Sequence, residues 1–273
     1  MRRFATLLAG LALASCAPVG DAYAGLQQAE RTALAAAVAN PARSEANRAR
    51  DRFRNPEATL AFFGVRPSHT VVELFPGGGW YSEILAPYVA NGGGTLYVAA
   101  PSDRGFQGFC RLVERDQALF GRARLVTFPV REAGQTGVPA GSADVVLTFR
   151  NVHNWMMGEQ PYADLAFQQI YAMLKPGGVL GIEEHRLPET ASAERERTSG
   201  YVKVSTVRRL AEQAGFQFAG SSEINANPRD TADWPQGVWT LPPTLRLGDQ
   251  DRARYLAIGE SDRMTLKFVK PRR

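Results

Sequence analysis

Two histidines have the side chains that are best suited to proton transfer in this chain. His153 lies in the stretch RNVHNW at residues 150–155, and His185 directly follows the acidic pair Glu183-Glu184. An imidazole titrates near neutral pH, so either histidine can act as a general base. Each also has a structural alternative, because His153 can fix its loop by hydrogen bonding and His185 can pair with a neighbouring glutamate. A metal site built from these four side chains is a further alternative, but one short segment would supply most of the ligands, so we predict no metal.

A glycine-rich turn supplies a second chemical feature. Residues 70–81 (TVVELFPGGGWY) predict a buried strand, a turn over Gly77-Gly78-Gly79 and the start of a helix. Glycine lets the backbone turn tightly and leaves no side chain between the main chain and a nucleotide-like ligand. Glu73 lies on the strand just before this turn, where its carboxylate can reach a bound cofactor.

Alternating strands and helices must position these residues. Apolar runs predict strands at residues 70–75, 95–100, 124–129, 143–149, 178–184, 216–223 and 264–270. Periodic apolar residues predict helices at residues 80–90, 106–120, 160–174 and 205–214. This alternation is typical of an α/β fold with a doubly wound, mostly parallel seven-stranded sheet that is covered on both faces. His153 follows the fourth strand and His185 follows the fifth, so both are expected at the carboxyl edge of the sheet, where such folds bind ligands.

Two segments lie outside this alternation. One is an N-terminal helical extension, with a helix predicted at residues 26–39 and a second, exposed helix over the arginine-rich residues 43–54. A short helix with Asn55 as its N-cap follows. Residues 225–262 are too long for a plain connection, and loops of that length are usually functional lids or disordered. Trp234 and Trp239 favour an ordered lid.

With these motifs identified, the chain resembles the class I S-adenosylmethionine-dependent methyltransferases over residues 55–270. The resemblance rests on ELFPGGG at residues 73–79, on LKPGG at residues 174–178 and on AGF at residues 214–216. RNVHNW at residues 150–155 and ESDRM at residues 260–264 further resemble a subgroup of predicted exported methyltransferases of unknown substrate.

The resemblance implies a Rossmann-like methyltransferase fold that uses S-adenosylmethionine as methyl donor, with an unidentified small molecule as acceptor. The residues implied to bind the cofactor are Glu73, Pro76, Gly77, Gly79 and Asp103. The residues implied to surround the transferred methyl group are His153, His185 and Asn151. Asp103 is included because Ala100 stands where the family usually has the acidic residue that binds the ribose. Phe75 is a second departure, since the family more often has its first glycine at that position.

Two other functions stay open at this point. The first is a non-catalytic ligand-binding protein on a methyltransferase fold, because Ala100 and Phe75 would fit a changed ligand. The second is a dinucleotide-dependent oxidoreductase, since Gly77-x-Gly79-x-x-Ser82 loosely matches its fingerprint. The oxidoreductase fold also needs an acidic residue at the end of its second strand, so Ala100 counts against both functions. The LKPGG turn and the last predicted strand favour the methyltransferase.

Charge and motifs argue against a nucleic-acid partner. The net charge is +5 and no run of five basic residues occurs, so no clustered basic stripe is visible. The Asn/Asp-Pro-Pro-Tyr pattern of many nucleic-acid amino-group methylases is absent after the fourth strand. We therefore expect a small-molecule substrate, and the sequence does not indicate an oligomeric state.

The first residues predict export. MRR is followed by the apolar stretch FATLLAGLALA at residues 4–14, which is too short to span a bilayer stably. LASC at residues 13–16 resembles a bacterial lipobox, which implies lipidation of Cys16. We therefore expect a signal peptide at residues 1–15, a linker and helices at residues 16–54, and the methyltransferase domain at residues 55–273. The predicted location is the periplasmic side of a bacterial membrane, held by the lipid anchor only, with a soluble periplasmic protein cleaved after Ala24 as the alternative.

Overall fold

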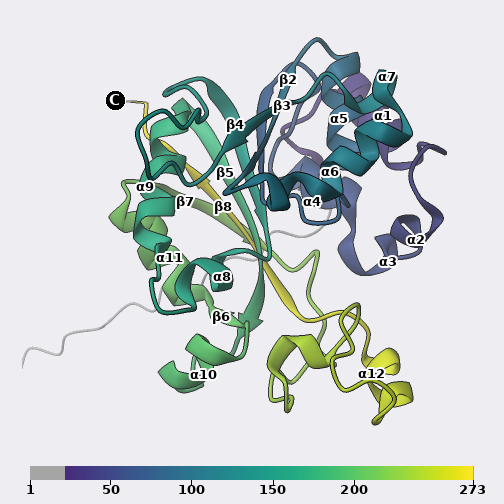
Figure 1. Ribbon diagram of the computed structural model, residues 1–273, viewed down its shortest axis with the longest axis vertical. Coiled ribbons are helices and arrows are strands. Elements are labelled where there is room, and N and C mark those ends of the chain that lie inside the picture. The colour runs from purple at the N-terminus through teal and green to yellow at the C-terminus, as the bar shows by residue number, and fades with distance from the viewer. Residues whose placement is uncertain (1–21, 273) are drawn as a thin grey trace, which may run out of the picture.

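The computed structural model describes residues 22–272, so the predicted signal segment and Cys16 lie outside the described residues. Figure 1 shows a twisted sheet with helices on both faces and a lobe of long loops at one end. Within the described residues, no helix is both long enough and apolar enough to cross a membrane. Cys110 has a free thiol and is half-buried in a helix.

The sheet confirms the predicted doubly wound, mostly parallel arrangement. Its strand order is β3-β2-β1-β4-β5-β8-β7. The strands are β1 (Thr70–Leu74), β2 (Thr95–Ala100), β3 (Arg124–Thr127), β4 (Ala143–Phe149), β5 (Leu174–Leu187), β7 (Gln217–Ser222) and β8 (Arg263–Val269). The first five pair in parallel, and β8 runs antiparallel to both β5 and β7. The short strand β6 (Val202–Lys203) pairs with the end of β5.

Side chains alternate between the two faces of the sheet and build a core on each face. Val72 of β1 packs with α9 (Ala163–Met173) and α11 (Val204–Gln213) on one side. Val71 packs on the other side with the helices that precede and follow β1 and β2. These helices are α1 (Gln28–Val38), α4 (Pro56–Phe62), α5 (Ser82–Asn91), α6 (Asp103–Arg115) and α7 (Gln117–Phe120).

The arginine-rich segment before β1 differs from the prediction of one exposed helix. It forms two short helices, α2 (Glu45–Arg48) and α3 (Asp51–Arg54). Arg43 and Arg54 are buried, at 2% and 3% exposure. Each is paired with a carboxylate, Arg43 with Asp51 of α3 and Arg54 with the distant Glu260, so their charges are compensated inside the fold. Asn55 does not cap α4 with its side chain. Its backbone is left-handed, and its Nδ2 donates to the carbonyl of Ile224 over 2.7 Å, which ties this segment to the end of β7.

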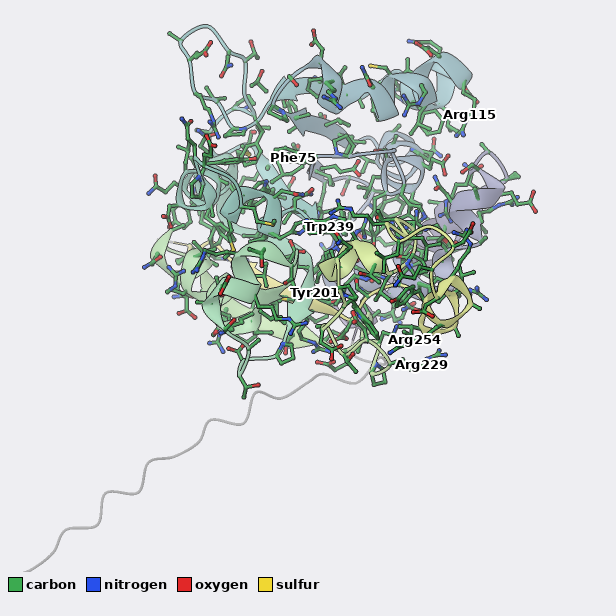
Figure 2. The ribbon with its side chains drawn as sticks, turned by 60° about the horizontal axis from the view of Figure 1, so that its bottom comes forward. Phe75, Arg115, Tyr201, Arg229, Trp239 and Arg254 are labelled. Carbon is green, nitrogen blue, oxygen red and sulfur yellow. The ribbon has the colours of Figure 1, made fainter. Side chains whose placement is uncertain are left out.

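Residues 225–262 are ordered and contain η2 (Gly237–Thr240) and α12 (Arg252–Ile258). They form a lobe together with α10 (Ala193–Thr198). An apolar cluster holds the lobe, and its members include Leu187, Tyr201, Trp234, Val238, Leu241 and Tyr255. The Asp230 carboxylate accepts hydrogen bonds from the Trp234 indole over 2.7 Å and from the backbone of Asp262 over 2.7 Å. In Figure 2, Trp239 and Tyr201 lie toward the middle of the molecule, whereas Arg229 and Arg254 lie at its rim. The lobe reaches the carboxyl edge of the sheet, because the ring of Trp239 lies 6.1 Å from that of His153, which follows β4.

Candidate active site

The carboxyl ends of β1, β4 and β5 lie side by side and bring the predicted residues to one edge. Leu74 pairs with Thr148, and Phe149 pairs with Glu183. The chain turns directly after β1 and β4 through two non-glycine residues with left-handed backbone, Phe75 at φ 51° and Arg150 at φ 62°. Such conformations cost about 1–3 kcal/mol each and cluster at functional sites.

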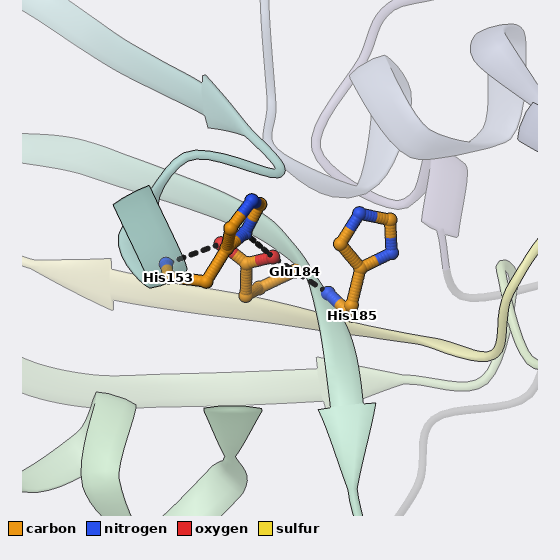
Figure 3. Close-up of side chains that lie close together, drawn as sticks. All are labelled: His153, Glu184 and His185. Carbon is orange, nitrogen blue, oxygen red and sulfur yellow. Dashed lines mark hydrogen bonds and ion pairs between the residues drawn. The ribbon is translucent and has the colours of Figure 1, made fainter. Parts of the chain in front are cut away.

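His153 is paired with Glu184 across this edge (Figure 3). It lies in α8 (Val152–Met156), a short helix that the sequence did not predict. Its Nδ1 is 2.9 Å from Glu184 Oε1, and its backbone N–H donates to Oε2 over 3.3 Å. Both side chains are buried. A carboxylate at Nδ1 favours the tautomer that carries its proton there, which leaves the Nε2 lone pair free to accept a proton.

His185 lies beside this pair but has a different ring partner. The two imidazole centroids are 5.3 Å apart, and His185 Nδ1 is 2.5 Å from the hydroxyl oxygen of Ser261. Its ring therefore does not pair with the glutamate side chains, although its backbone N–H donates to Glu184 over 2.8 Å. Burial holds the pKa of His185 well below its usual range, and the neighbouring His153 and Arg150 lower it further. His185 is thus neutral near pH 7.

Glu183 and Glu184 have separate roles because successive strand residues face opposite sides. The Glu183 carboxylate accepts from Arg263 over 2.8 Å, from Arg150 over 3.1 Å and from the Tyr81 hydroxyl over 3.0 Å. Burial alone would raise the pKa of Glu183, but the two arginines lower it below its usual range. Glu183 is therefore a structural anion, and Glu184 is the carboxylate that orients a histidine.

His153 and His185 border a cavity of about 320 Å³. Its walls also contain Arg50, Arg54, Arg150, Trp239 and Glu260. The Trp239 ring lies 6.1 Å from that of His153. One wall thus comes from residues 225–262, and another comes from the N-terminal extension.

The glycine turn is open on one side and packed on the other. A β-carbon at Gly77 or Gly78 would have no heavy atom within 4 Å. Gly79 instead faces α6, where a β-carbon would lie 2.7 Å from Leu112 Cδ1. Gly108 of α6 packs so closely that its β-carbon would lie 1.8 Å from the carbonyl oxygen of Gly77. The open face at Gly77 and Gly78 leaves room for a ligand against the backbone.

The other predicted cofactor residues lie around this turn. The Glu73 carboxylate is buried and accepts from the Ser82 hydroxyl over 2.6 Å. Burial raises the pKa of Glu73 to about 7, although the Ser82 hydrogen bond opposes the shift. Pro76 is buried, and Asp103 is exposed in the first turn of α6. Asn151 donates from Nδ2 to the carbonyl of Leu74 over 3.2 Å, so it bridges the glycine-turn strand and the His153 segment.

Glu73→Gln is expected to stabilise the protein by about 3 kcal/mol at pH 8. A raised carboxylate pKa contributes stability that is fully present below the unfolded pKa and is lost as pH rises through the folded pKa. For Glu73 this window runs from the ordinary value of 4.5 to about 7. Glutamine has no charge to desolvate, so the variant does not lose this stability as the pH rises. Urea unfolding at pH 4.5 and pH 8 measures the difference, which should nearly vanish at pH 4.5. Equal stability of the two proteins at pH 8 would refute a raised pKa.

Several site residues have no signal in the local sequence. The pairing of Glu184 with His153, and of Ser261 with His185, joins segments that are 31 and 76 residues apart. The alternation of faces along β5 is the one available hint that Glu183 and Glu184 differ. His153, Glu184 and His185 also offer ligand atoms within 4.8 Å of one another, a spacing that would admit a metal ion. The neighbouring arginines make the site less favourable for a divalent cation, and the absence of a metal stays a prediction.

Comparisons with known proteins bear on the fold. No protein-family model and no curated protein matches the chain. Among solved structures, an S-adenosylmethionine-dependent methyltransferase from Aquifex aeolicus matches with a TM-score of 0.54 and 14% identity, over 81% of this chain and 92% of that one. The cyclase SpnF matches with a TM-score of 0.58 and 16% identity, over 94% and 98%. Phosphoethanolamine N-methyltransferase 2 of Haemonchus contortus, in complex with S-adenosyl-L-methionine, matches with a TM-score of 0.52 and 18% identity, over 80% and 53%.

At these identities the likeness shows the fold alone. The strand order with its antiparallel β8 agrees with it. The chain therefore has the fold of the class I S-adenosylmethionine-dependent methyltransferases.

Proposed function

We propose that this protein transfers a methyl group from S-adenosylmethionine to a small molecule. One observation carries the proposal: the open glycine turn after β1 and the His153–Glu184 pair lie at the same edge of the sheet, joined by the Asn151 hydrogen bond to Leu74. In open α/β sheets this edge is where ligands bind. The methyltransferases from Aquifex aeolicus and Haemonchus contortus, which share the fold, support this choice of cofactor.

The residues present fit this cofactor in part. Gly77 and Gly78 leave space against the backbone, and Glu73 provides a carboxylate near the turn for an ammonium group. When bound, S-adenosylmethionine supplies an electrophilic methyl group on a sulfonium, so much of the catalysis is positioning. His153 Nε2 then accepts a proton from the acceptor atom, and Glu184 stabilises the resulting imidazolium. Neutral His185 can hydrogen-bond the acceptor beside it.

Gly78→Ala is expected to weaken S-adenosylmethionine binding at least tenfold while leaving the fold intact. The new β-carbon meets no protein atom, and the residue does not need a left-handed backbone, so only a ligand lying against the turn would feel it. Calorimetric titration of S-adenosylmethionine and S-adenosylhomocysteine into residues 17–273 measures both affinities. We expect micromolar binding by the unsubstituted protein. Binding that Gly78→Ala leaves unchanged would place the cofactor elsewhere.

The second candidate is a non-catalytic binding protein on this fold. It is favoured by Phe75, whose ring lies 6.1 Å from both Phe128 and Trp155, and by the buried Ala100 at the end of β2. The predicted export of the chain also favours it, because S-adenosylmethionine is not made outside the cytoplasm. Well-folded protein that binds neither form of the cofactor would support this candidate over methyl transfer.

A further inference from the structure

The cavity beside His153 carries more positive than negative charge on and behind its walls. Four arginines gather there around two carboxylates. The ion pairs join Glu260 to Arg50, Arg54 and Arg263, and Glu183 to Arg150 and Arg263. The cluster keeps a surplus of positive charge even if Glu184 is counted as ionised and both imidazoles as neutral.

Arg50 has a hydrogen-bond donor that the protein does not use. Its Nε donates to Glu260 over 2.6 Å, but its Nη2 is buried without a hydrogen-bond partner among the described residues. Arg50 also lines the cavity. A buried donor without an acceptor is costly, and more so on a charged group. If the Arg50 side chain turned toward the cavity that it lines, Nη2 would donate to a ligand oxygen there, and this cost would be removed.

Arg54 shows that the cluster lacks negative charge. Its side chain is 3% exposed and its Nε donates to Glu260 over 3.0 Å. Burial lowers the pKa of Arg54 to about 9, and the positive charge of Arg150 adds to the effect despite the opposing Glu260. An additional anion beside these guanidinium groups would stabilise their charged forms.

We infer that this cavity binds the anionic group, a carboxylate or a phosphate, of a small-molecule substrate, with Arg50 as a hydrogen-bond donor. The assignment rests on the proposed function in one respect, since it treats the bound anion as the methyl acceptor. Its anionic end would face Arg50, and its reacting atom would face His153. The cavity volume of about 320 Å³ suits a small molecule. A metal ion at His153, Glu184 and His185 is the rival occupant, and the positive surplus disfavours it.

Phosphate-dependent thermal stability of Arg50→Gln tests the inference. With inorganic phosphate as probe and chloride at matched ionic strength, the unsubstituted protein should gain about 3 °C in Tm at tenfold the dissociation constant. Arg50→Gln should lose most of this gain, because the amide keeps neither the charge nor the guanidinium donors. Arg52→Gln is the matched control, since Arg52 lies two residues away outside this cavity, and it should keep the full gain. Arg50→Lys keeps the charge opposite Glu260 and should lose part of the gain. A repeat with acetate distinguishes a carboxylate site from a phosphate site.

Two results would overturn the inference. One is a phosphate response that is no larger than that of chloride, or that is equal in Arg50→Gln and Arg52→Gln. The other is stabilisation by Zn²⁺ without stabilisation by either anion, which would assign the site to a metal. The anion titrations contain no S-adenosylmethionine, so a negative result in them does not affect the test of cofactor binding. A negative result in the cofactor titration likewise does not affect the test of anion binding.

Discussion

Arg263→Met is expected to lower the free energy of unfolding by about 3–5 kcal/mol at pH 7. Arg263 is 1% exposed, and its guanidinium donates to Glu183 over 2.8 Å and to Glu260 over 3.1 Å. Methionine keeps much of the volume but removes the cation that these two buried carboxylates share. Removing the cation leaves buried negative charge with too little compensation, and this destabilises the fold by more than the intact ion pairs stabilise it. The loss of folding free energy should therefore be large. Urea unfolding followed by circular dichroism measures it.

The pH dependence of this loss distinguishes electrostatics from packing. Burial raises the pKa of Glu260, but Arg263, Arg54 and Arg50 outweigh it and bring the pKa to about 2. A lowered carboxylate pKa contributes stability above the unfolded value of 4.5, and that stability is lost as pH falls toward 2. The difference between the variant and the unsubstituted protein should therefore shrink below pH 4.5. A difference that is constant with pH would point to packing alone.

Arg208→Met is the control for this substitution. Its ion pair with Glu212 is exposed at both ends, with side chains 39% and 50% accessible. Exposed pairs contribute about 0–1 kcal/mol, so the control should remain close to the unsubstituted protein. Equal losses in Arg208→Met and Arg263→Met would contradict the role of burial.

His153→Ala is expected to lower the rate of methyl transfer by about 10²–10⁴-fold, the range for loss of a general base. S-adenosylmethionine affinity should stay unchanged, because His153 lines the cavity beside Trp239 and its hydrogen bonds and ring contacts join it to Glu184, His185 and Trp239. Glu184→Gln should act in the same direction, since an amide no longer favours the Nδ1–H tautomer. Formation of S-adenosylhomocysteine from a panel of small carboxylates and phosphate esters that carry hydroxyl or amino groups measures the rate.

His69→Ala is the control for His153→Ala. His69 precedes β1, and its Nδ1 accepts from the backbone of Arg66 over 3.3 Å, far in the fold from the strand ends that carry the site. The control should turn over at the unsubstituted rate. A His153→Ala protein that binds S-adenosylmethionine and is as active as this control would remove His153 from the mechanism.

The local sequence predicted the strands and the glycine turn that position the site, but not the short helix α8 that carries His153. Buried strands such as residues 70–74 have continuous apolar runs, and the glycines at 77–79 mark the turn, because both patterns depend on neighbours along the chain. It also placed His153 and His185 at the same edge, since parallel strands end together. The predicted export and lipidation of Cys16 stay predictions.

The errors share a physical cause. Residues 43–54 read as an exposed helix because their charge density is typical of a solvated surface. In the structure, Arg54 is buried because Glu260, 206 residues away, compensates its charge. The fifth strand was predicted to end at residue 184 but continues to Leu187, where the C-terminal lobe packs on it.

The sequence by itself determined the seven main strands, the helices that alternate with them, the glycine turn and the chemical types at the strand ends, because backbone propensity and hydrophobic periodicity are local. Only the tertiary structure decided which glutamate serves which partner. Glu183 became a structural anion through Arg263, and Glu184 became the partner of His153. The tertiary structure also left Arg50 with an unused donor beside the cavity. These outcomes depend on side chains from distant segments sharing one low-dielectric site, where burial and the neighbouring charges together set the charge state of each group.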